Sequence, residues 1–303
     1  MIEVLYDIVH PQTGAKGRLR VAGGIWIGDE CVFEFTDTVY GLVGVARCDW
    51  RQPAPRLEVQ EGPAADAGAR QLMAKLQQLL LAFHHGAYRG ASDEVLAALY
   101  QGSYHREMNY AVNSPLEAEY KGRLSALLLE LCDAGKVLDV GCAAGEVVRQ
   151  LRQRGVEAWG FDICPQLDEI AYEDTRAFLR RGSADAIPFG PEDGFDTAIA
   201  LDVLEHVPED RVPAMVQELV RLGIKNVAAH IALCEFQYPG HVTLRPMHWW
   251  DAQLAPWYRR DAFSDGGVAA RMVPQERADP AQMLRVYRLI EAPALRPELV
   301  LQR

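Results

Sequence analysis

The chain has 303 residues, with 42 acidic and 31 basic side chains, and its formal net charge is −11 at pH 7. Hydrophobic residues make up 49% and charged residues 24% of the sequence, a globular composition that excludes the disordered and fibrous classes. Proteins that bind nucleic acids gather Lys and Arg to contact phosphates, so we do not expect a nucleic-acid partner for this acidic chain.

The cysteines and the apolar segments indicate the compartment. The six cysteines show no CxxC spacing, which argues against a zinc site and against a disulfide framework (residues 31, 48, 132, 142, 164 and 234). The N-terminal segment MIEVLYDIVHPQTG lacks the basic and apolar regions of a signal peptide. No apolar stretch reaches the ~20 residues that cross a bilayer. We therefore expect a cytoplasmic protein without a membrane partner.

Residues 1–60 read as an accessory antiparallel β-module. Ile2, Val4, Tyr6 and Ile8 alternate with polar residues, and a turn follows at 11–14. Further apolar segments at 19–21, 25–27, 32–35 and 39–45 complete a predicted meander of four or five strands. This module could bind a protein partner, form a homo-oligomer or cover an acceptor pocket.

Residues 61–114 are expected to form a linker and a helical connector or lid. The proline-rich segment 51–68 is typical of a linker, and apolar residues between 72 and 83 recur with helical period. Ser92 is a predicted helix N-cap. Tyr104, Tyr110 and Tyr120 stand in or just after this segment, where they could shield a ligand or simply pack.

From residue 115 to 303 the pattern is that of one α/β domain. Strands are predicted at 137–140, 157–163, 195–201 and 226–233, with helices at 145–154 and 211–222. The strands are apolar throughout, as in parallel strands covered on both faces. Strands that alternate with helices indicate βαβ units.

The segment VLDVGCAAG at 137–145 places a tight glycine turn between a buried strand and a helix. Glycine allows close approach of a ligand to the backbone, and the helix offers free N–H groups. Asp139 lies before the glycines, where a carboxylate would suit a cationic amino-acid group. Asp162 ends the next strand, about twenty residues on, and is placed to hold ribose hydroxyls.

Five segments together resemble the class I S-adenosylmethionine (SAM)-dependent methyltransferases. They are VLDVGCAAG, the acid Asp162, GSADAIPF, FDTAIALDVLEHVP and HVTLRPMHWW, and the resemblance covers residues of about 115–293 but not the first 110. It implies a Rossmann-like seven-stranded sheet with helices on both faces, whose antiparallel last strand would be residues 283–290. Within the superfamily, the sequence most resembles methyltransferases from sugar, polysaccharide and natural-product pathways.

The resemblance also implies a set of residues that bind SAM. Asp139, Gly141 and Gly145 would cradle the methionine portion, Asp162 would hold the ribose, and the loop 182–189 would border the adenine. The full predicted set is Asp139, Gly141, Cys142, Gly145, Asp162, Ile163, Ser183, Ala184, Leu201 and Asp202. Two positions depart from the family pattern: Ala143 replaces a common glycine, and Ser183 stands where Asp is frequent, so that either Ser183 or Asp185 would contact the adenine amino group.

His206 and His241 are the candidate catalytic residues. Transfer to an alcohol requires loss of the hydroxyl proton, and imidazole suits a general base near neutral pH. Asp202, Glu205 and His206 also have the spacing DxxEH, which could bind Mg²⁺ or Mn²⁺. Because LEHVP is widespread in methyltransferases that bind no metal, we expect no metal here.

The segment HVTLRPMHWW resembles an acceptor site. Arg245 could grip an acidic or hydroxylated acceptor, and Trp249 with Trp250 could offer a face to a sugar or an aromatic ring. Alternatively, the tryptophans form the buried stripe of a helix, because 250, 254 and 257 follow helical spacing.

The sequence predicts a SAM-dependent methyltransferase that methylates an oxygen of a small-molecule or glycan-linked acceptor. The alternatives are an N- or C-methyltransferase of a specialised metabolite, a metal-dependent RNA 2′-O-methyltransferase, and a non-catalytic SAM-binding scaffold whose β-module recruits a partner.

Overall fold

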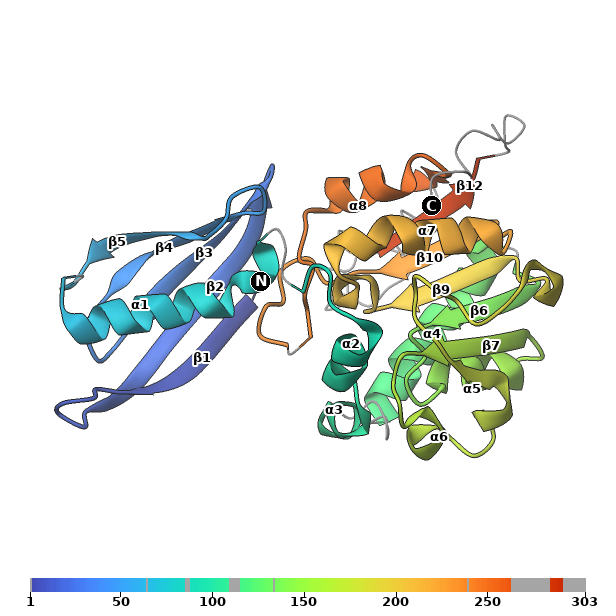
Figure 1. Cartoon of the computed structure of the whole chain (residues 1–303), viewed down its shortest axis with the longest axis horizontal. Coiled ribbons are helices and arrows are strands. Elements are labelled where there is room, and N and C mark those ends of the chain that lie inside the picture. Colours follow the sequence, from blue (N-terminus) through green and yellow to red (C-terminus); the bar gives the residue numbers. More distant parts are fainter. Residues whose placement is uncertain are drawn as a thin grey trace.

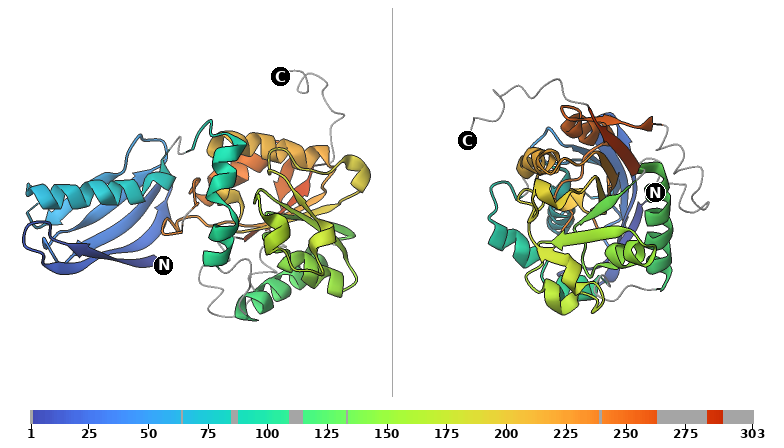
Figure 2. Two further views of the ribbon diagram at one scale, coloured as in Figure 1. Left: turned by 60° about the horizontal axis from the view of Figure 1, so that its bottom comes forward. Right: turned by 90° about the vertical axis from the view of Figure 1, so that its right-hand side faces the viewer.

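The computed structural model describes residues 2–63, 65–84, 88–108, 115–132, 134–238, 240–262 and 284–290. Within them the chain forms two sheets, one of five strands and one of seven. Figures 1 and 2 show an elongated molecule with the five-stranded sheet and helix α1 at one end and the seven-stranded sheet at the other.

The N-terminal sheet is a simple antiparallel meander in the order β1-β2-β3-β4-β5. Its strands are β1 (Ile2–Val9), β2 (Lys16–Ile27), β3 (Glu30–Asp37), β4 (Val43–Asp49) and β5 (Arg56–Glu61). Each strand pairs antiparallel with the next. In β3 and β4 every second residue is buried, so the sheet has one covered face. The predicted antiparallel sheet is confirmed, with five strands.

Three local predictions in this region were wrong. The segment 51–68 is not simply a linker, because it contains β5, an edge strand whose polar residues hide its alternation. The strand predicted at 39–45 begins only at Val43, since the Asp37 carboxylate accepts the backbone N–H groups of 39, 40 and 42 and holds a turn there. Gly23 and Gly24 do not separate two strands but form a bulge inside β2.

Helix α1 (Ala67–Leu79) covers the buried face of this sheet (Figure 1). Asp66 caps its N-terminus by accepting the N–H groups of Gly68 and Ala69. Leu72 and Leu76 lie in one apolar cluster with the sheet residues Phe33 and Phe35. The helix thus packs with the β-strands, whereas the proposed division of the chain at residues 60 and 114 stays a prediction.

Helices α2 (Asp93–Leu99), α3 (Gly102–Glu107) and α4 (Pro115–Cys132) lead into the second sheet. Its strands are β6 (Lys136–Val140), β7 (Glu157–Asp162), β8 (Leu179–Arg181), β9 (Thr197–Leu201), β10 (Asn226–His230), β11 (Tyr258–Arg260) and β12 (Leu284–Leu289). They lie in the order β11-β12-β10-β9-β6-β7-β8. All are parallel except β12, which runs antiparallel to both neighbours. The predicted antiparallel last strand is confirmed as β12.

Helices cover both faces of the second sheet. Helices α7 (Val212–Arg221) and α8 (Met247–Leu254) share one apolar cluster with Leu138 of β6. Helices α4 and α5 (Glu146–Gln153) share another with Val137, the neighbouring residue of the same strand. This is the Rossmann-like arrangement expected for buried parallel strands. Among the described helices, including the short α6 (Leu167–Ile170), none is long and apolar enough to span a bilayer.

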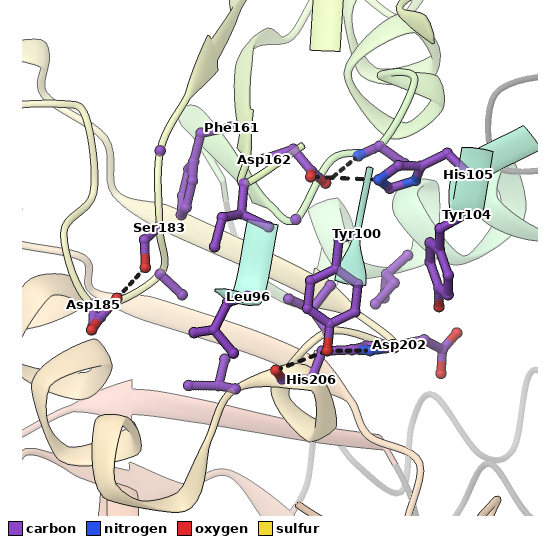
Figure 3. Close-up of a pocket in the computed structure, with 18 of the residues that line it drawn as sticks. Leu96, Tyr100, Tyr104, His105, Phe161, Asp162, Ser183, Asp185, Asp202 and His206 are labelled. Carbon is purple, nitrogen blue, oxygen red and sulfur yellow. Dashed lines mark hydrogen bonds and ion pairs between the residues drawn. The ribbon is translucent and has the colours of Figure 1, made fainter. Parts of the chain in front are cut away.

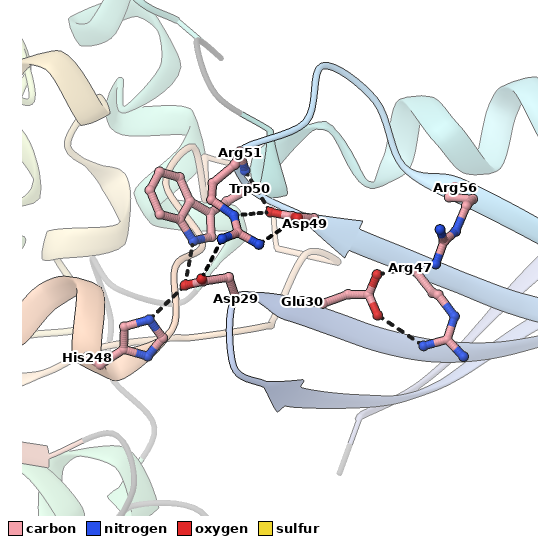
Figure 4. A network of polar contacts seen from close by, with 8 residues as sticks. All are labelled: Asp29, Glu30, Arg47, Asp49, Trp50, Arg51, Arg56 and His248. Carbon is pink, nitrogen blue, oxygen red and sulfur yellow. Dashed lines mark hydrogen bonds and ion pairs between the residues drawn. The ribbon is translucent and has the colours of Figure 1, made fainter.

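The two sheets are joined by contacts far apart in sequence. Phe236, after β10, packs edge-on against Phe33 of β3, with ring centroids 5.1 Å apart. The Trp26 indole donates a hydrogen bond to the carbonyl of Leu233 at 3.0 Å. Figure 4 shows a polar contact between the units, in which His248 of α8 lies 2.8 Å from Asp29.

Candidate active site

A cavity opens at the carboxyl ends of the parallel strands β6, β7 and β9. It encloses about 1020 Å³ of empty space, counting the part open to solvent. Eight of the predicted site residues line it, namely Gly141, Asp162, Ile163, Ser183, Ala184, Leu201, Asp202 and His206 (Figure 3).

The glycine turn after β6 brings backbone close to the cavity. Gly141 has φ of +68°, and a Cβ there would lie 2.7 Å from the Val203 side chain. Gly145 has φ of +87° and is the N-cap of α5, where a Cβ would come within 2.9 Å of Thr175. Ala143, at the position where a glycine is common, also has a positive φ of +47°. The turn therefore keeps its left-handed geometry without the second glycine.

Asp139 is buried beside this turn and is only 3% exposed. With Cys142 it lines a second, smaller cavity that adjoins the glycine turn. Its Oδ2 has no hydrogen-bond partner among the residues that the structure describes. Burial raises the pKa of Asp139 to about 8, although the charge of Lys121 acts in the opposite direction. An orphaned buried carboxyl of this kind fits the cationic amino group of an amino-acid ligand.

Asp162 ends β7 and is fixed between two loops. Its Oδ2 accepts the Ala143 N–H at 2.9 Å, and its Oδ1 accepts the Cys164 N–H at 2.9 Å. Nε2 of His105 lies 3.7 Å from Oδ1 (Figure 3). Each carboxylate oxygen has two lone pairs, so the group can still accept hydrogen bonds from a ligand. This orientation fits a partner for ribose hydroxyls.

The loop after β8 forms the wall where the adenine is predicted. The Ser183 hydroxyl donates to the carboxylate of Asp185, and Arg211 contacts the other Asp185 oxygen at 3.1 Å. Ser183, Ala184 and Asp185 all line the cavity. The two side chains considered for the adenine amino group thus form one hydrogen-bonded unit (Figure 3).

Asp202, at the end of β9, forms an ion pair that the sequence interpretation missed. Its Oδ1 lies 2.7 Å from Nδ1 of His230 at the end of β10. Burial opposes both charges, but the mutual attraction lowers the pKa of Asp202 and raises that of His230. Asp202 also has an unusual φ of +55° for a residue with a side chain. His230 could have been found from the sequence, because it is a polar residue at the end of the apolar strand β10, which neighbours β9.

The two predicted catalytic histidines are neighbours. Their ring centroids are 4.8 Å apart, in an edge-to-face arrangement. His206 lines the cavity, whereas His241 lies behind it with a side chain that is 6% exposed. Burial lowers the pKa of His206 to about 3 and that of His241 to about 4. Both are therefore neutral and weakly basic at pH 7, and their role as general bases stays a prediction.

Helices α2 and α3 supply the cover over the cavity. Leu96, Tyr100, Tyr104 and His105 line it from this side. Tyr100 follows α2 and donates a hydrogen bond to the carbonyl of Gly240 at 2.7 Å. Tyr104 was predicted near the ligand, but Tyr100 was not, because one tyrosine after a short helix carries no motif. Tyr110 and the side chain of Tyr120 lie outside the described residues.

The segment around Arg245 is structural. Arg245 is 0% exposed, pairs with the carboxylate of Glu209 and donates to the carbonyl of Ala82. The expectation that Arg245 grips an acceptor was therefore wrong, because the guanidinium is used inside the protein. Trp249 and Trp250 are 8% and 0% exposed, which confirms their interpretation as a buried stripe.

The metal site considered from the DxxEH spacing does not form with Asp202, Glu205 and His206 as its three ligands. Asp202 pairs with His230 and is not part of the cluster formed by Glu205 and His206. His241 joins that cluster instead, and one ligand atom from each of the three lies within 4.8 Å of the others.

Together the fold and this cavity define a Rossmann-like methyltransferase. Six strands run in parallel with one antiparallel strand between them, and a glycine turn follows β6. Carboxylates stand at β6 and at the ends of β7 and β9, as a nucleoside with a cationic amino-acid group requires.

Comparison with known proteins identifies the family. The model of a methyltransferase domain matches residues 112–265, about half of the chain. The chain belongs to this family, the class I SAM-dependent methyltransferases, whose methyl donor is SAM.

The individual relatives are distant. The chain is 31% identical over 83 residues to a ubiquinone biosynthesis O-methyltransferase from Leptothrix cholodnii, covering 25% of this chain and 35% of that protein. It is 29% identical over 102 residues to a magnesium-protoporphyrin O-methyltransferase from Synechocystis, covering 32% and 44%. The chain thus spans less than half the length of these curated relatives. The crystal structure of magnesium protoporphyrin IX methyltransferase from Synechocystis with bound SAH has a TM-score of 0.47 at 14% identity, covering 66% of this chain and 99% of that one.

Proposed function

We propose that the protein transfers the methyl group of SAM to an oxygen atom of a small hydroxylated or glycan-linked acceptor. The observation that carries this proposal is the pair of adjoining cavities at the strand ends, the larger lined by His206 and Tyr104 and the smaller by the orphaned Asp139 carboxyl. The curated relatives named above are O-methyltransferases, which supports oxygen as the acceptor atom.

The residues of the chain would hold SAM along one wall. Asp139 would accept the amino group, Asp162 the ribose hydroxyls, and the loop with Ser183 and Ala184 would border the adenine. When bound, SAM supplies an electrophilic methyl group on a cationic sulfur. Transfer is an in-line displacement, so the main task of the protein is to hold the acceptor oxygen aligned with that methyl group.

Uncharged side chains surround the cavity near His206, where we place the acceptor. Burial raises the pKa of Tyr100 and Tyr104, so both hydroxyls stay protonated. His206 is neutral for the same reason. Aromatic rings and neutral hydrogen-bonding groups suit a sugar or phenol better than a strongly charged molecule.

Calorimetric titration with SAM and with S-adenosylhomocysteine (SAH) tests the cofactor site. We expect micromolar affinity, on the order of −8 kcal/mol, and a loss of at least about tenfold (~1.4 kcal/mol) in Asp162→Ala. Asp168→Ala, an exposed acid nearby, is the matched control and should bind like the parent. Equal affinity in Asp162→Ala and the parent would show that the assignment is wrong. A screen of sugars and phenols with methyl-labelled SAM then tests the acceptor class.

A further inference from the structure

Glu205, His206 and His241 form a compact group beside the acceptor end of the cavity, here named the 205–206–241 cluster. Glu205 and His206 belong to the short 3-10 turn Leu204–His206 after β9, and His241 belongs to the loop after β10. One ligand atom from each residue lies within 4.8 Å of the others. Nε2 of His241 is 3.9 Å from Oε1 of Glu205.

The carboxyl group of this cluster is buried and incompletely bonded. Glu205 is 0% exposed. Its Oε1 accepts the Ala232 N–H at 3.2 Å, but its Oε2 has no hydrogen-bond partner within the described part of the chain. A buried oxygen without a partner is destabilising, and more so when the group is charged. A bound cation would remove that cost.

Both imidazoles of the cluster are held in the form that binds metals. Nδ1 of His206 lies 2.9 Å from the carbonyl of Gly240, and Nδ1 of His241 lies 2.7 Å from the carbonyl of Glu235. A carbonyl only accepts, so each Nδ1 must carry the proton and each Nε2 must carry the lone pair. Histidines that bind metals usually have this second contact, which fixes the ring and its tautomer.

The backbone holds the two halves of the cluster together. The carbonyl of Glu205 accepts the N–H groups of Val242 and Thr243, each at 2.9 Å. Tyr100 also donates to the carbonyl of Gly240. Gly240 has φ of +89°, and a Cβ there would lie 2.6 Å from the Tyr100 ring. The backbone therefore brings the three side chains close together without an ion.

We propose that Glu205, His206 and His241 bind one divalent transition-metal ion, of the class of Zn²⁺, Co²⁺ or Mn²⁺. Two imidazoles and one carboxylate are a donor set for such ions, whereas Mg²⁺ and Ca²⁺ prefer oxygen ligands alone. Three protein ligands leave coordination positions open. Asp202, which the sequence spacing grouped with Glu205 and His206, instead forms an ion pair with His230.

His206 lines the cavity, so an ion bound to it would stand at the acceptor end. A metal ion lowers the pKa of a bound hydroxyl group and thereby makes it a better nucleophile. The catalytic role of the ion rests on the proposed O-methylation, but the binding of the ion does not.

The test is metal titration of the tag-free full-length chain after removal of metals with a chelator. We expect calorimetry with Zn²⁺ and visible absorption with Co²⁺ to show one ion per chain. Glu205→Gln and His241→Asn should each raise the Kd at least about tenfold, a loss of the size seen when even the supporting partners of metal ligands are removed. His248→Asn is the matched control, since its imidazole is 59% exposed and lies on α8. Its Kd should equal that of the parent.

The same samples are titrated with SAH to separate the two hypotheses. Absence of stoichiometric binding of Zn²⁺ and Co²⁺, or equal Kd values in His241→Asn and His248→Asn, would overturn the metal site. Loss of Co²⁺ binding in His241→Asn with unchanged SAH affinity would support it and exclude misfolding. Failure to bind SAH by a parent chain that still binds Co²⁺ would refute the proposed function and leave the metal site standing.

Discussion

Asp139 is a buried acid whose incompletely hydrogen-bonded carboxyl costs stability. Its carboxyl is buried, and one of its oxygens has no partner in the described structure. Because burial raises its pKa to about 8, ionisation is resisted until a cation arrives. The sequence already singled out Asp139, because an acid inside an apolar strand, just before a glycine turn, is unusual unless it contacts a ligand.

Asp139→Asn should separate stability from cofactor binding. A carboxyl whose folded-state pKa lies above its usual 3.8 stabilises the fold at low pH, and that contribution is lost as pH rises from about 4 to 8. The SAM-free parent should therefore lose up to about 1.4 kcal/mol per pH unit in this window relative to the variant. Urea unfolding at pH 5 and pH 8 measures this difference.

The same variant should bind both SAM and SAH at least about tenfold more weakly, since both carry the amino group (~1.4 kcal/mol). Parental affinity in the variant would show that Asp139 does not bind the ligand. Stability relative to the parent that does not change with pH would show that its pKa is not raised in the folded protein. Asp168→Asn serves as the exposed control.

His230→Asn tests the ion pair with Asp202. The raised pKa of His230 stabilises the fold fully below its usual 6.5, and this is lost as pH rises through the folded value. The lowered pKa of Asp202 stabilises the fold above its usual 3.8 and is lost as pH falls. The variant should therefore lose about 1–2 kcal/mol, less than a fully buried pair because Asp202 is 41% exposed.

The pH dependence distinguishes this pair from simple packing. The loss should be largest between about pH 4 and 6.5 and should shrink by pH 9, as followed by urea unfolding. His248→Asn removes a far more exposed imidazole and should cost at most about 0.5 kcal/mol. A loss in His230→Asn that is equal at every pH would contradict the ion pair.

At the scale of elements, β6, β7, β9 and β10 were predictable because each is a short, mostly apolar run. The strands β8 and β11 were missed, because two of the three residues in each are arginines. The strand β5 was also missed, because only two of its six residues, Leu57 and Val59, are apolar and prolines precede and follow it. The pairs Asp202–His230 and Glu205–His241 were hidden for another reason. Each joins residues from two different strand ends, 28 and 36 positions apart, and only the sheet order brings them together.

Leu76→Ala tests whether α1 is part of the N-terminal sheet's core. Leu76 is 1% exposed in the cluster that also holds Phe33 and Phe35. Its truncation should cost about 2–5 kcal/mol in unfolding free energy. Leu81→Ala is the control, because Leu81 is 45% exposed and should cost less than about 0.5 kcal/mol. Equal losses in urea unfolding would mean that α1 does not contribute to this core.

At the scale of the whole molecule, the two units meet through a small set of aromatic and polar contacts. Phe236 enters the apolar cluster of the N-terminal sheet from the loop after β10, next to Phe33 and Phe83. The Leu244 N–H donates to the carbonyl of Ala82 at 3.0 Å. Residues 231–238 and 240–245 thus connect the N-terminal sheet to the region of His206 and His241, so the packing of the first unit supports the site in the second.

Phe236→Ala should loosen this connection. Truncation of a phenylalanine that is 7% exposed costs about 3–5 kcal/mol when the surroundings do not collapse. We expect calorimetric unfolding to change from one cooperative transition to two, with the N-terminal unit melting first, because its core loses a ring supplied by the other unit. Leu5→Ala, on the open face of β1 and 52% exposed, should keep a single transition.

The loosened loop should also affect the cavity. Because His241 lies five residues after Phe236, metal binding to the 205–206–241 cluster should weaken in Phe236→Ala. SAH, whose proposed contacts are on β6 and β7, should bind almost as in the parent. Parental metal affinity in a chain that unfolds in two steps would show that the N-terminal unit and the acceptor end of the cavity are independent. Loss of both affinities together would show instead that the substitution disturbs the whole second sheet.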